Sequence, residues 1–590
     1  MHILGISCFY HDAVAALLRD GQLVAAAEEE RFSRKKHDYG FPTHAINFCL
    51  KQAGIESGDL DYVVFYEKPF VKFDRILMTT IATFPRSSAV FRESMISWFK
   101  DKLWVKRSIQ EQLKTPSDKI LFVDHHTSHA ASAFFCSPFE EAATVTFDGV
   151  GEWATATIGR GRAAWANGGQ NELRTISELR FPHSLGLFYS AFTAFLGFEV
   201  NDGEYKVMGM APYGQPRYQD KVNKLIRVEK DGSFWLDMNY FCFHQSTERT
   251  FNDKFEELFG TPRDPKADFA TSETDPDVSP SSDVSRQNQY YADVAASVQK
   301  VSEEIALRMV RHAHEKTGLK KLCLAGGVAL NSVANGRIVQ EGPFDEVFIQ
   351  PAAGDSGGAL GAALYAYHVL LGKPRVFTME HAYWGSAYGP DQIREALEQA
   401  GLRYQVVEDD DRLIDTVVDD LVAGRVIGWF QGRFEWGPRA LGNRSIIADP
   451  RRAEMKNVVN SKIKFREPFR PFAPAILEER AADYFTFDAT RQYPTRFMLL
   501  VLPIRPERAD QIPAVNHMGT GRLQTVRPEW NLRYYEILRK FGQATGVPVI
   551  LNTSFNLRGE PIVTDPGHAI STFLRSGLDA LVLGNFRVEK

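Results

Sequence analysis

The sequence ILGISCFYHDAVAALLRDGQLVAAA, residues 3–27, decides the fold class of this chain. Apolar runs at 3–6, 13–18 and 23–27 predict three short strands, and a polar loop separates the first two. The Asp20-Gly21 pair between the second and third runs is typical of a tight hairpin. The stretch therefore predicts a strand–loop–strand–hairpin–strand unit whose first loop carries polar side chains.

A related pattern returns in ATVTFDGVGEWATATI, residues 143–158. An apolar run, an acidic glycine loop and a second strand follow one another as in the first unit. A helical stretch separates the two units, and repetition of this kind indicates an internal duplication.

Further along, helices and strands alternate. A long periodic segment at 289–316 predicts a helix, followed by strands at 321–325 and 346–349 and a helix of small residues that runs to about 371. Alternation of this kind favours an α/β fold with ligands at the carboxyl ends of the strands.

Length predicts more than one domain, because 590 residues exceed what one core normally holds. The regular pattern breaks after 372, so we expect domains at 1–372 and 380–590. An insertion at about 215–290 is expected in the first domain. Its segment 260–290 is rich in Pro, Ser, Thr and Asp and is predicted to be exposed.

Composition argues against nucleic-acid-binding, secreted, membrane and disulfide-stabilised proteins. The chain has a net charge of −5 and so lacks the overall positive charge typical of nucleic-acid-binding proteins. No nucleic-acid partner is therefore expected. The first thirty residues lack the apolar core of a signal peptide, and no apolar run is long enough to span a bilayer, so no membrane partner is expected. Five scattered cysteines argue against disulfides and zinc knuckles. A cytoplasmic protein is the expectation.

A metal site is one interpretation of DHHTSHAA, residues 124–131. His125 and His129 are four apart and share a helix face, whereas His126 points elsewhere. Asp148 and Asp355 follow strands in glycine-rich turns and could complete a nitrogen–oxygen shell. The alternative is a polar helix start with hydrogen-bonded histidines and turn aspartates.

Glycine-rich turns after strands could approach phosphates, among them Gly326-Gly327 in AGGVALNS, which ends near Asn331. None matches the P-loop or the dinucleotide fingerprint. Tight packing turns are the alternative explanation.

Arginine and lysine are frequent among glycine and proline in the last third of the chain. The stretches GRFEWGPRALGNRS and KIKFREPFRPFAP hold Arg439, Lys464 and Arg470. Arg522 and the NTSFN stretch with Ser554 come later. Guanidinium groups held in such turns suit phosphate and nucleotide binding.

Together these segments resemble the NodU/CmcH family of carbamoyltransferases. The resemblance rests on LGIS…YHDAVAAL, EERFSRKKHD, DHHTSHAASAF, FDGVGEW, GEYKVMGMAPYG, AGGVALNS, PAAGDSGGALGAAL, GRFEWGPRALGNRSI, KFREPFRPFAPA and LNTSFN, in this order over nearly the whole chain. It implies a duplicated actin/hexokinase-like (ASKHA) domain fused to a YrdC-like α/β domain.

The resemblance also implies an activity. ATP and carbamoyl phosphate would give carbamoyl-AMP in the smaller module, and the larger one would transfer the carbamoyl group to a hydroxyl of a small-molecule, natural-product acceptor. A divalent metal, iron or zinc, would assist, and Mg²⁺ could accompany ATP.

By position, His125, His129, Asp148 and Asp355 match the family's metal shell, and His11 matches the catalytic histidine, either as a general base or by holding the carbamoyl group. The residues matched to donor and nucleotide binding are Arg439, Lys464, Arg470, Arg522 and Ser554, with Gly326, Gly327 and Asn331 as further nucleotide-site candidates.

Three other functions are weighed against this one. A tRNA threonylcarbamoyl-type transferase would not require the arginine-rich module, and the acidic balance disfavours RNA. A hydrogenase-maturation carbamoyltransferase would carry zinc-finger cysteines that this chain lacks. An actin-like sugar kinase or non-catalytic ATP-binding regulator would not need carbamoyl phosphate. Whether two copies form a homodimer is left open.

Overall fold

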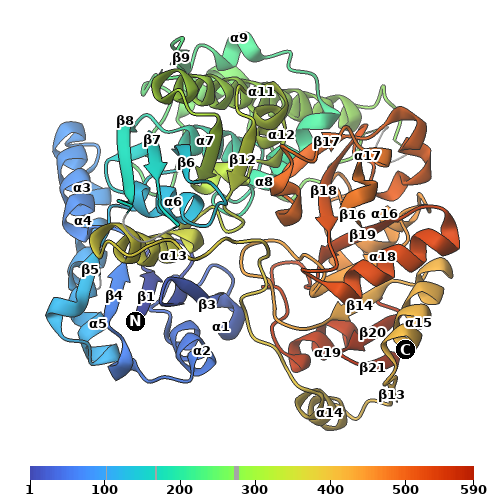
Figure 1. Cartoon of the computed structure of the whole chain (residues 1–590). Helices are drawn as coiled ribbons and strands as arrows, with labels where there is room; N and C mark the ends of the chain where they lie inside the picture. The colour runs from blue at the N-terminus through green and yellow to red at the C-terminus, as the bar shows by residue number, and fades with distance from the viewer. Residues whose placement is uncertain (101, 166–168, 272–277) are drawn as a thin grey trace. The chain divides into compact units, whose positions relative to one another are not determined.

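The computed structural model describes residues 1–100, 102–165, 169–271 and 278–590 (Figure 1). The chain divides into two compact units whose main junction lies between Thr378 and Met379. Two short segments near the N-terminus, Ala25–Asp38 and Thr43–Phe48, group with the second unit. Nothing in the sequence pattern indicated that division of the N-terminal region.

The first sheet of the first unit has the strand order β3-β2-β1-β4-β5. Strand β1 pairs antiparallel with β2 and parallel with β4, and β4 pairs parallel with β5. Asp20 and Gly21 join β2 to β3 with φ of 49° and 81°, the left-handed pair that a type I′ hairpin requires. The strands are β1 (His2–Ser7), β2 (Val14–Arg19), β3 (Gln22–Glu28), β4 (Tyr62–Phe65) and β5 (Ile120–Phe122).

The second sheet repeats this plan with the order β8-β7-β6-β11-β12. Strand β6 pairs antiparallel with β7 and parallel with β11, as β1 does with β2 and β4. The predicted duplication and the actin/hexokinase-like α/β fold are therefore confirmed by strand order and direction. The strands are β6 (Glu141–Phe147), β7 (Ala154–Arg162), β8 (Glu172–Arg180), β11 (Lys321–Ala325) and β12 (Glu346–Ile349).

Two equivalent helices connect the halves. Helix α6 (His125–Phe134) follows β5, and α13 (Asp355–Tyr365) follows β12. Each packs on the sheet of the other half, and the two helices contact each other. The small residues of α13 allow this: a Cβ on Gly361 would lie 1.8 Å from the carbonyl oxygen of Ser128, so only glycine fits. Close packing of α6 on α13 brings their first turns together.

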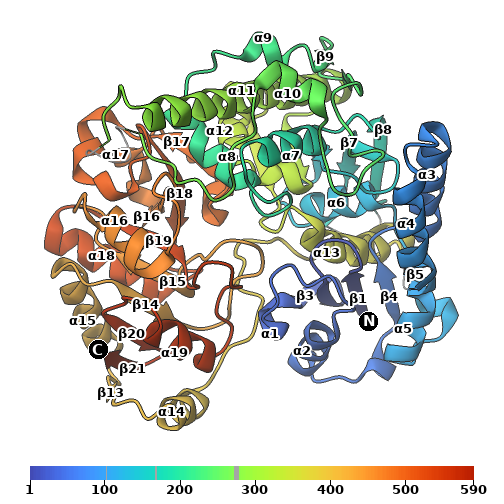
Figure 2. The same cartoon turned by 180° about the vertical axis from the view of Figure 1, so that it is seen from behind.

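The rest of the first unit is largely helical, with a separate β9–β10 hairpin (Figure 2). Its other elements include α3 (Pro69–Thr83), α4 (Ser88–Lys100), α5 (Val105–Leu113), α7 (Leu185–Phe195), α8 (Glu204–Met210), β9 (Ile226–Val228), β10 (Phe234–Leu236), α10 (Asp253–Phe259), α11 (Asp283–Thr317) and α12 (Ser332–Glu341).

The expected insertion needs correction on one point. Helix α11 begins at Asp283, capped by the Ser282 side chain, and is longer than the predicted 289–316. Most described residues of segment 260–290 are exposed, as predicted, although Arg263 and Phe269 are buried. Residues 272–277 lie outside the described part of the chain.

The second unit is built on a nine-stranded mixed sheet of order β13-β21-β20-β14-β15-β19-β16-β18-β17. Its core includes Trp429, Ile447 and Tyr534, which are fully buried. This mixed α/β architecture is the one expected for the YrdC-like module. Its main elements are α14 (Pro390–Gln399), β13 (Gln405–Val406), α15 (Asp410–Val422), β14 (Ile427–Phe430), β15 (Arg444–Ala448), α16 (Met455–Val458), β16 (Ala473–Leu477), β17 (Leu500–Pro503), β18 (Thr520–Val526), α18 (Leu532–Thr545), β19 (Val549–Ser554), α19 (Pro566–Leu574), β20 (Ala580–Leu583) and β21 (Phe586–Glu589).

Among the described residues, no helix combines the length and apolar content needed to cross a bilayer.

Candidate functional sites

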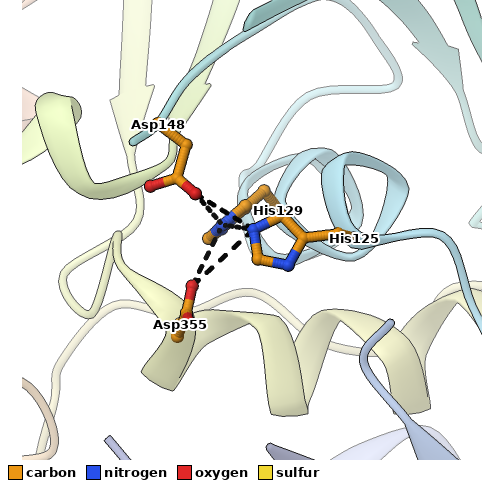
Figure 3. Close-up of side chains that lie close together, drawn as sticks. All are labelled: His125, His129, Asp148 and Asp355. Carbon is orange, nitrogen blue, oxygen red and sulfur yellow. Dashed lines mark hydrogen bonds and ion pairs between the residues drawn. The ribbon is translucent and has the colours of Figure 1, made fainter. Parts of the chain in front are cut away.

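Two histidines on one face of α6 form half of the first candidate site (Figure 3). His125 is the first residue of α6, and His129 follows one turn later, so both rings lie on the same side. Their Nε2 atoms are 3.1 Å apart and both side chains are buried.

Two aspartates complete the site. Asp148 is the first residue after β6, and Asp355 is the first residue of α13, equivalent to His125 in the other half. Asp148 Oδ2 lies 3.0 Å from His125 Nε2 and 3.8 Å from His129 Nε2. Asp355 Oδ1 lies 3.7 and 3.6 Å from the same two atoms. Figure 3 shows the four side chains converging from α6, α13 and the loop after β6.

This donor set fits a divalent ion. One ligand atom from each of the four buried residues lies within 4.8 Å of all the others. In a tetrahedral site with bonds of about 2.1 Å, ligand atoms lie about 3.4 Å apart, close to the separations seen here. Imidazole and carboxylate together suit zinc or iron. We call these four residues the HHDD cluster.

Neighbouring groups fix both carboxylates. The backbone N–H of Gly327 donates to Asp148 Oδ1 (3.1 Å), and the Tyr66 hydroxyl donates to Asp355 Oδ2 (3.3 Å). Each aspartate thus has one oxygen tethered and the other facing the histidines, as in metal sites with an outer hydrogen-bonding layer. His126 lies apart and hydrogen-bonds Thr146 Oγ1.

Electrostatics within the cluster favour a bound cation. Burial alone would lower the pKa of His129, but the carboxylates of Asp148 and Asp355 raise it to about 9. Burial opposes ionisation of Asp148, yet the two histidines hold its pKa well below its ordinary value. Without a metal, a proton on His129 therefore provides the positive charge that an ion would supply. Burial lowers the pKa of His126 to about 3, so that ring is neutral.

His11 lies in the loop between β1 and β2, where Asp12 adopts a left-handed φ of 50°. Its Nδ1 is 2.9 Å from Asp12 Oδ2, and its Nε2 is 3.2 Å from the Asn201 carbonyl oxygen. Asp12 and Asn201 orient the imidazole ring through these two contacts.

The AGGVALNS residues have structural partners. Gly326 has φ of 92°, and a Cβ there would lie 2.0 Å from the Phe147 carbonyl oxygen. The Asn331 side chain accepts from the N–H of Ala334, capping α12, and exchanges hydrogen bonds with the Gln299 amide. Gly327 holds Asp148, as described above. A nucleotide role for these three residues stays a prediction.

A second candidate site lies in the second unit, where basic side chains from several loops gather beside β18 and β19. Charge interactions link Arg522 to Arg439, and link Arg466 and Arg470 to both Arg522 and Lys464. Glu467 is the acidic neighbour, 3.6 Å from Arg470. We call this group the cation cluster: Arg439, Lys464, Arg466, Arg470 and Arg522.

Lys464 and Arg522 are its most perturbed members. Lys464 Nζ donates to Ser554 Oγ (3.2 Å) and Asn556 Oδ1 (2.7 Å) and to the backbone carbonyls of both residues. Burial, and then Arg466 and Arg470, lower the pKa of Lys464 well below its usual value. Burial likewise lowers the pKa of Arg522, whose Nε has no hydrogen-bond partner among the described residues. The cluster has an excess of positive charge, which favours an anion.

The other arginines of these motifs have separate structural partners. Arg444 is buried and donates to the backbone carbonyls of Gln431 and Gly432, and Arg433 donates to that of Gly385. Arg527 pairs with Glu478. Conversely, sequence reasoning did not select Arg466 or Asn556, although both lie inside quoted motifs, KFREPFR and LNTSFN.

The described residues thus form a duplicated actin-like unit with the HHDD cluster and an α/β unit with the cation cluster. Models of known protein families match the chain in both regions. Residues 2–364 match the model described as "Carbamoyltransferase N-terminus", and 418–590 match "Carbamoyltransferase C-terminus". The chain belongs to this carbamoyltransferase family and is a carbamoyltransferase.

Relatives match over the whole chain. An uncharacterised protein of Synechocystis is 47% identical over 100% of this chain and 97% of its own length. Nodulation protein NolNO of Sinorhizobium fredii is 36% identical over 99% of this chain and 79% of its own length. Among solved structures, T. kodakarensis HypF gives a TM-score of 0.30 at 12% identity, covering 63% of this chain and 48% of that one. A score this low carries no weight, and the fold assignment rests on strand topology.

Proposed function

We propose that this carbamoyltransferase activates carbamoyl phosphate with ATP and transfers the carbamoyl group to a hydroxyl of a small-molecule acceptor. The cation cluster is the observation that carries the proposal. Carbamoyl phosphate, ATP and pyrophosphate are all anionic. Burial and then the neighbouring arginines lower the pKa of Lys464 and of Arg522, and an anion bound among these cations would offset their repulsion.

In this proposal Arg439, Arg470 and Arg522 hold phosphate oxygens, since guanidinium groups bind them in pairs. Lys464 keeps the end of β19 in place through Ser554 and Asn556 and adds a positive charge. There water would cleave carbamoyl phosphate to carbamate and inorganic phosphate. The carbamate oxygen would then attack the α-phosphorus of ATP, so that carbamoyl-AMP forms and pyrophosphate leaves. Both donors are cytoplasmic metabolites, which is why we place the reaction in the cytoplasm.

Transfer is assigned to the first unit. His125, His129, Asp148 and Asp355 would hold a divalent ion, iron or zinc, which supplies Lewis acidity when bound. His11 would either act as a general base or hold the carbamoyl group by a hydrogen bond. The loop between β1 and β2 would position this group.

A direct test measures pyrophosphate release from ATP with and without carbamoyl phosphate. The proposal expects release only with the donor. A kinase or regulator of the same fold would hydrolyse or bind ATP without it, and donor-independent turnover would refute this assignment. Mass spectrometry with hydroxylated metabolites then identifies the acceptor.

A further inference from the structure

A segment near the N-terminus, Ala25–Asp38, groups with the second unit, although the residues on both sides of it belong to the first. It contains two buried charged residues. Glu28 is the last residue of β3 and is 5% exposed, and Arg31 lies in the short helix α1 (Glu30–Ser33) and is 1% exposed. Glutamate and arginine are rarely buried to this extent unless specific partners bind them.

Both side chains bind the backbone of one residue, Gly437. The N–H of Gly437 donates to Glu28 Oε1 (2.8 Å), and Arg31 Nη2 donates to the Gly437 carbonyl oxygen (2.6 Å). Arg31 Nε lies 3.4 Å from Glu28 Oε2, so the two side chains also form an ion pair. Gly437 has a φ of 105°, a conformation that glycine adopts without strain. We call Glu28 and Arg31 the Gly437 clamp.

The clamp lies close in sequence to a member of the cation cluster, because Arg439 is two residues after Gly437. On the other side of Arg439, Asn552 Nδ2 donates to the Ala440 carbonyl oxygen (3.2 Å). Asn552 belongs to β19, the strand that also carries Ser554. Side chains from two distant parts of the chain therefore hold the backbone immediately before and after Arg439.

We propose that Glu28 and Arg31 are positioning residues for the donor site, because their hold on Gly437 fixes Arg439 within the cation cluster. The inference rests on the proposed function, in which Arg439 binds donor phosphate. A guanidinium binds phosphate through two N–H groups only at a defined distance and angle. A shift of about 1 Å in such a group can cost about a hundredfold in rate. A structural role alone would change stability and leave the phosphate affinity of the folded protein unaltered.

Pyrophosphate affinity of the full-length protein, measured by isothermal titration calorimetry, tests the proposal without acceptor or metal. Arg439→Ala should weaken binding about tenfold or more. Arg31→Met should weaken it about fivefold or more in the parent. Because Arg31 acts through Arg439, adding Arg31→Met to Arg439→Ala should change the affinity less than about twofold. Arg31→Lys keeps a donor for the Gly437 carbonyl oxygen and should recover most of the affinity.

A second variant guards against loss of folding. Arg31→Met alone leaves Glu28 buried without its counter-charge, which destabilises the fold, whereas Glu28→Met/Arg31→Met removes both charges. Circular dichroism checks that this double variant is folded, and it should repeat the loss of affinity. Arg375→Met is the matched control, since Arg375 is also 1% exposed and also donates to a backbone carbonyl, that of Phe134 in the first unit. It should bind pyrophosphate as the parent does.

The outcomes separate this inference from the proposed function. Parent-like affinity in folded Glu28→Met/Arg31→Met would overturn the inference and leave the donor site in place. An equal loss from Arg31→Met in the parent and in Arg439→Ala would also overturn it, since the clamp would then act independently of Arg439. A similar loss in Arg375→Met would have the same consequence. Parent-like affinity in Arg439→Ala would refute the donor-site assignment itself, and the inference with it.

Discussion

The HHDD cluster and the cation cluster are both buried or half-buried groups of polar side chains, but their charges are opposite. The first pairs two carboxylates with two imidazoles, and a proton on His129 offsets one of the two negative charges. The second sets four arginines and a lysine against Glu467. Under the proposed function, a metal cation would offset the negative charge of the first site and anionic donors would offset the positive charge of the second.

They also differ in how the fold builds them. The HHDD cluster comes from equivalent helix starts in the two halves of a duplicated unit, held together by glycine-permitted packing of α6 on α13. The cation cluster takes Arg522 from β18, Lys464 from the end of the helical turn Val459–Lys464, and its other arginines from loops. Variants that impair only one half-reaction would support two separate sites. A single substitution that impairs both half-reactions would contradict them.

The largest expected effect belongs to His129→Ala. Because this ring faces both aspartates, its loss should remove about one equivalent of metal and abolish transfer to the acceptor. Elemental analysis measures the metal, and pyrophosphate release should stay near the parent value. His126→Gln is the control and should keep its metal, since His126 hydrogen-bonds Thr146 instead. Unchanged metal content in His129→Ala would remove the metal assignment.

Lys464→Ala should stop carbamoyl-phosphate-dependent pyrophosphate release while metal content stays at the parent level. The substitution removes a buried charge and its contacts with Ser554 and Asn556. Arg439→Ala should act in the same way. Lys462→Ala, exposed two residues earlier, is the matched control and should release pyrophosphate normally. Normal release from both Lys464→Ala and Arg439→Ala would place adenylation elsewhere.

His11→Ala should lower carbamoylated product by about two to four orders of magnitude and still form carbamoyl-AMP. His11→Gln distinguishes the two possible roles. A glutamine amide can donate a hydrogen bond but cannot accept the hydroxyl proton, so partial recovery supports positioning and no recovery supports a base. Equal losses in both half-reactions from folded His11→Ala would mean that one site performs both steps.

The sequence predicted the duplicated strands, the helix with His125 and His129, and Asp148 and Asp355, because hydrophobic periodicity and turn residues are local features of a sequence. It also placed Arg439, Lys464 and Arg522 in one module. It could not separate ligand-type arginines from structural ones, because Arg444 and Arg439 stand in the same motif and only tertiary contacts show that Arg444 binds backbone carbonyls. It missed Tyr66, whose contact with Asp355 spans 289 residues.

The smallest expected effect tests a residue matched to nucleotide binding. Asn331 caps α12 and bonds Gln299, so we expect Asn331→Ala to cost about 1 kcal/mol of unfolding free energy, the usual value of an N-cap. Urea unfolding followed by circular dichroism measures this cost. Pyrophosphate release should change less than twofold at temperatures where the variant is folded. Asn331→Asp keeps the capping oxygen and should recover most of the stability. If Asn331→Ala is instead stable but needs much more ATP for half-maximal rate, Asn331 contacts the nucleotide, and anionic donors are held in both units. That result would remove the division between the two centres.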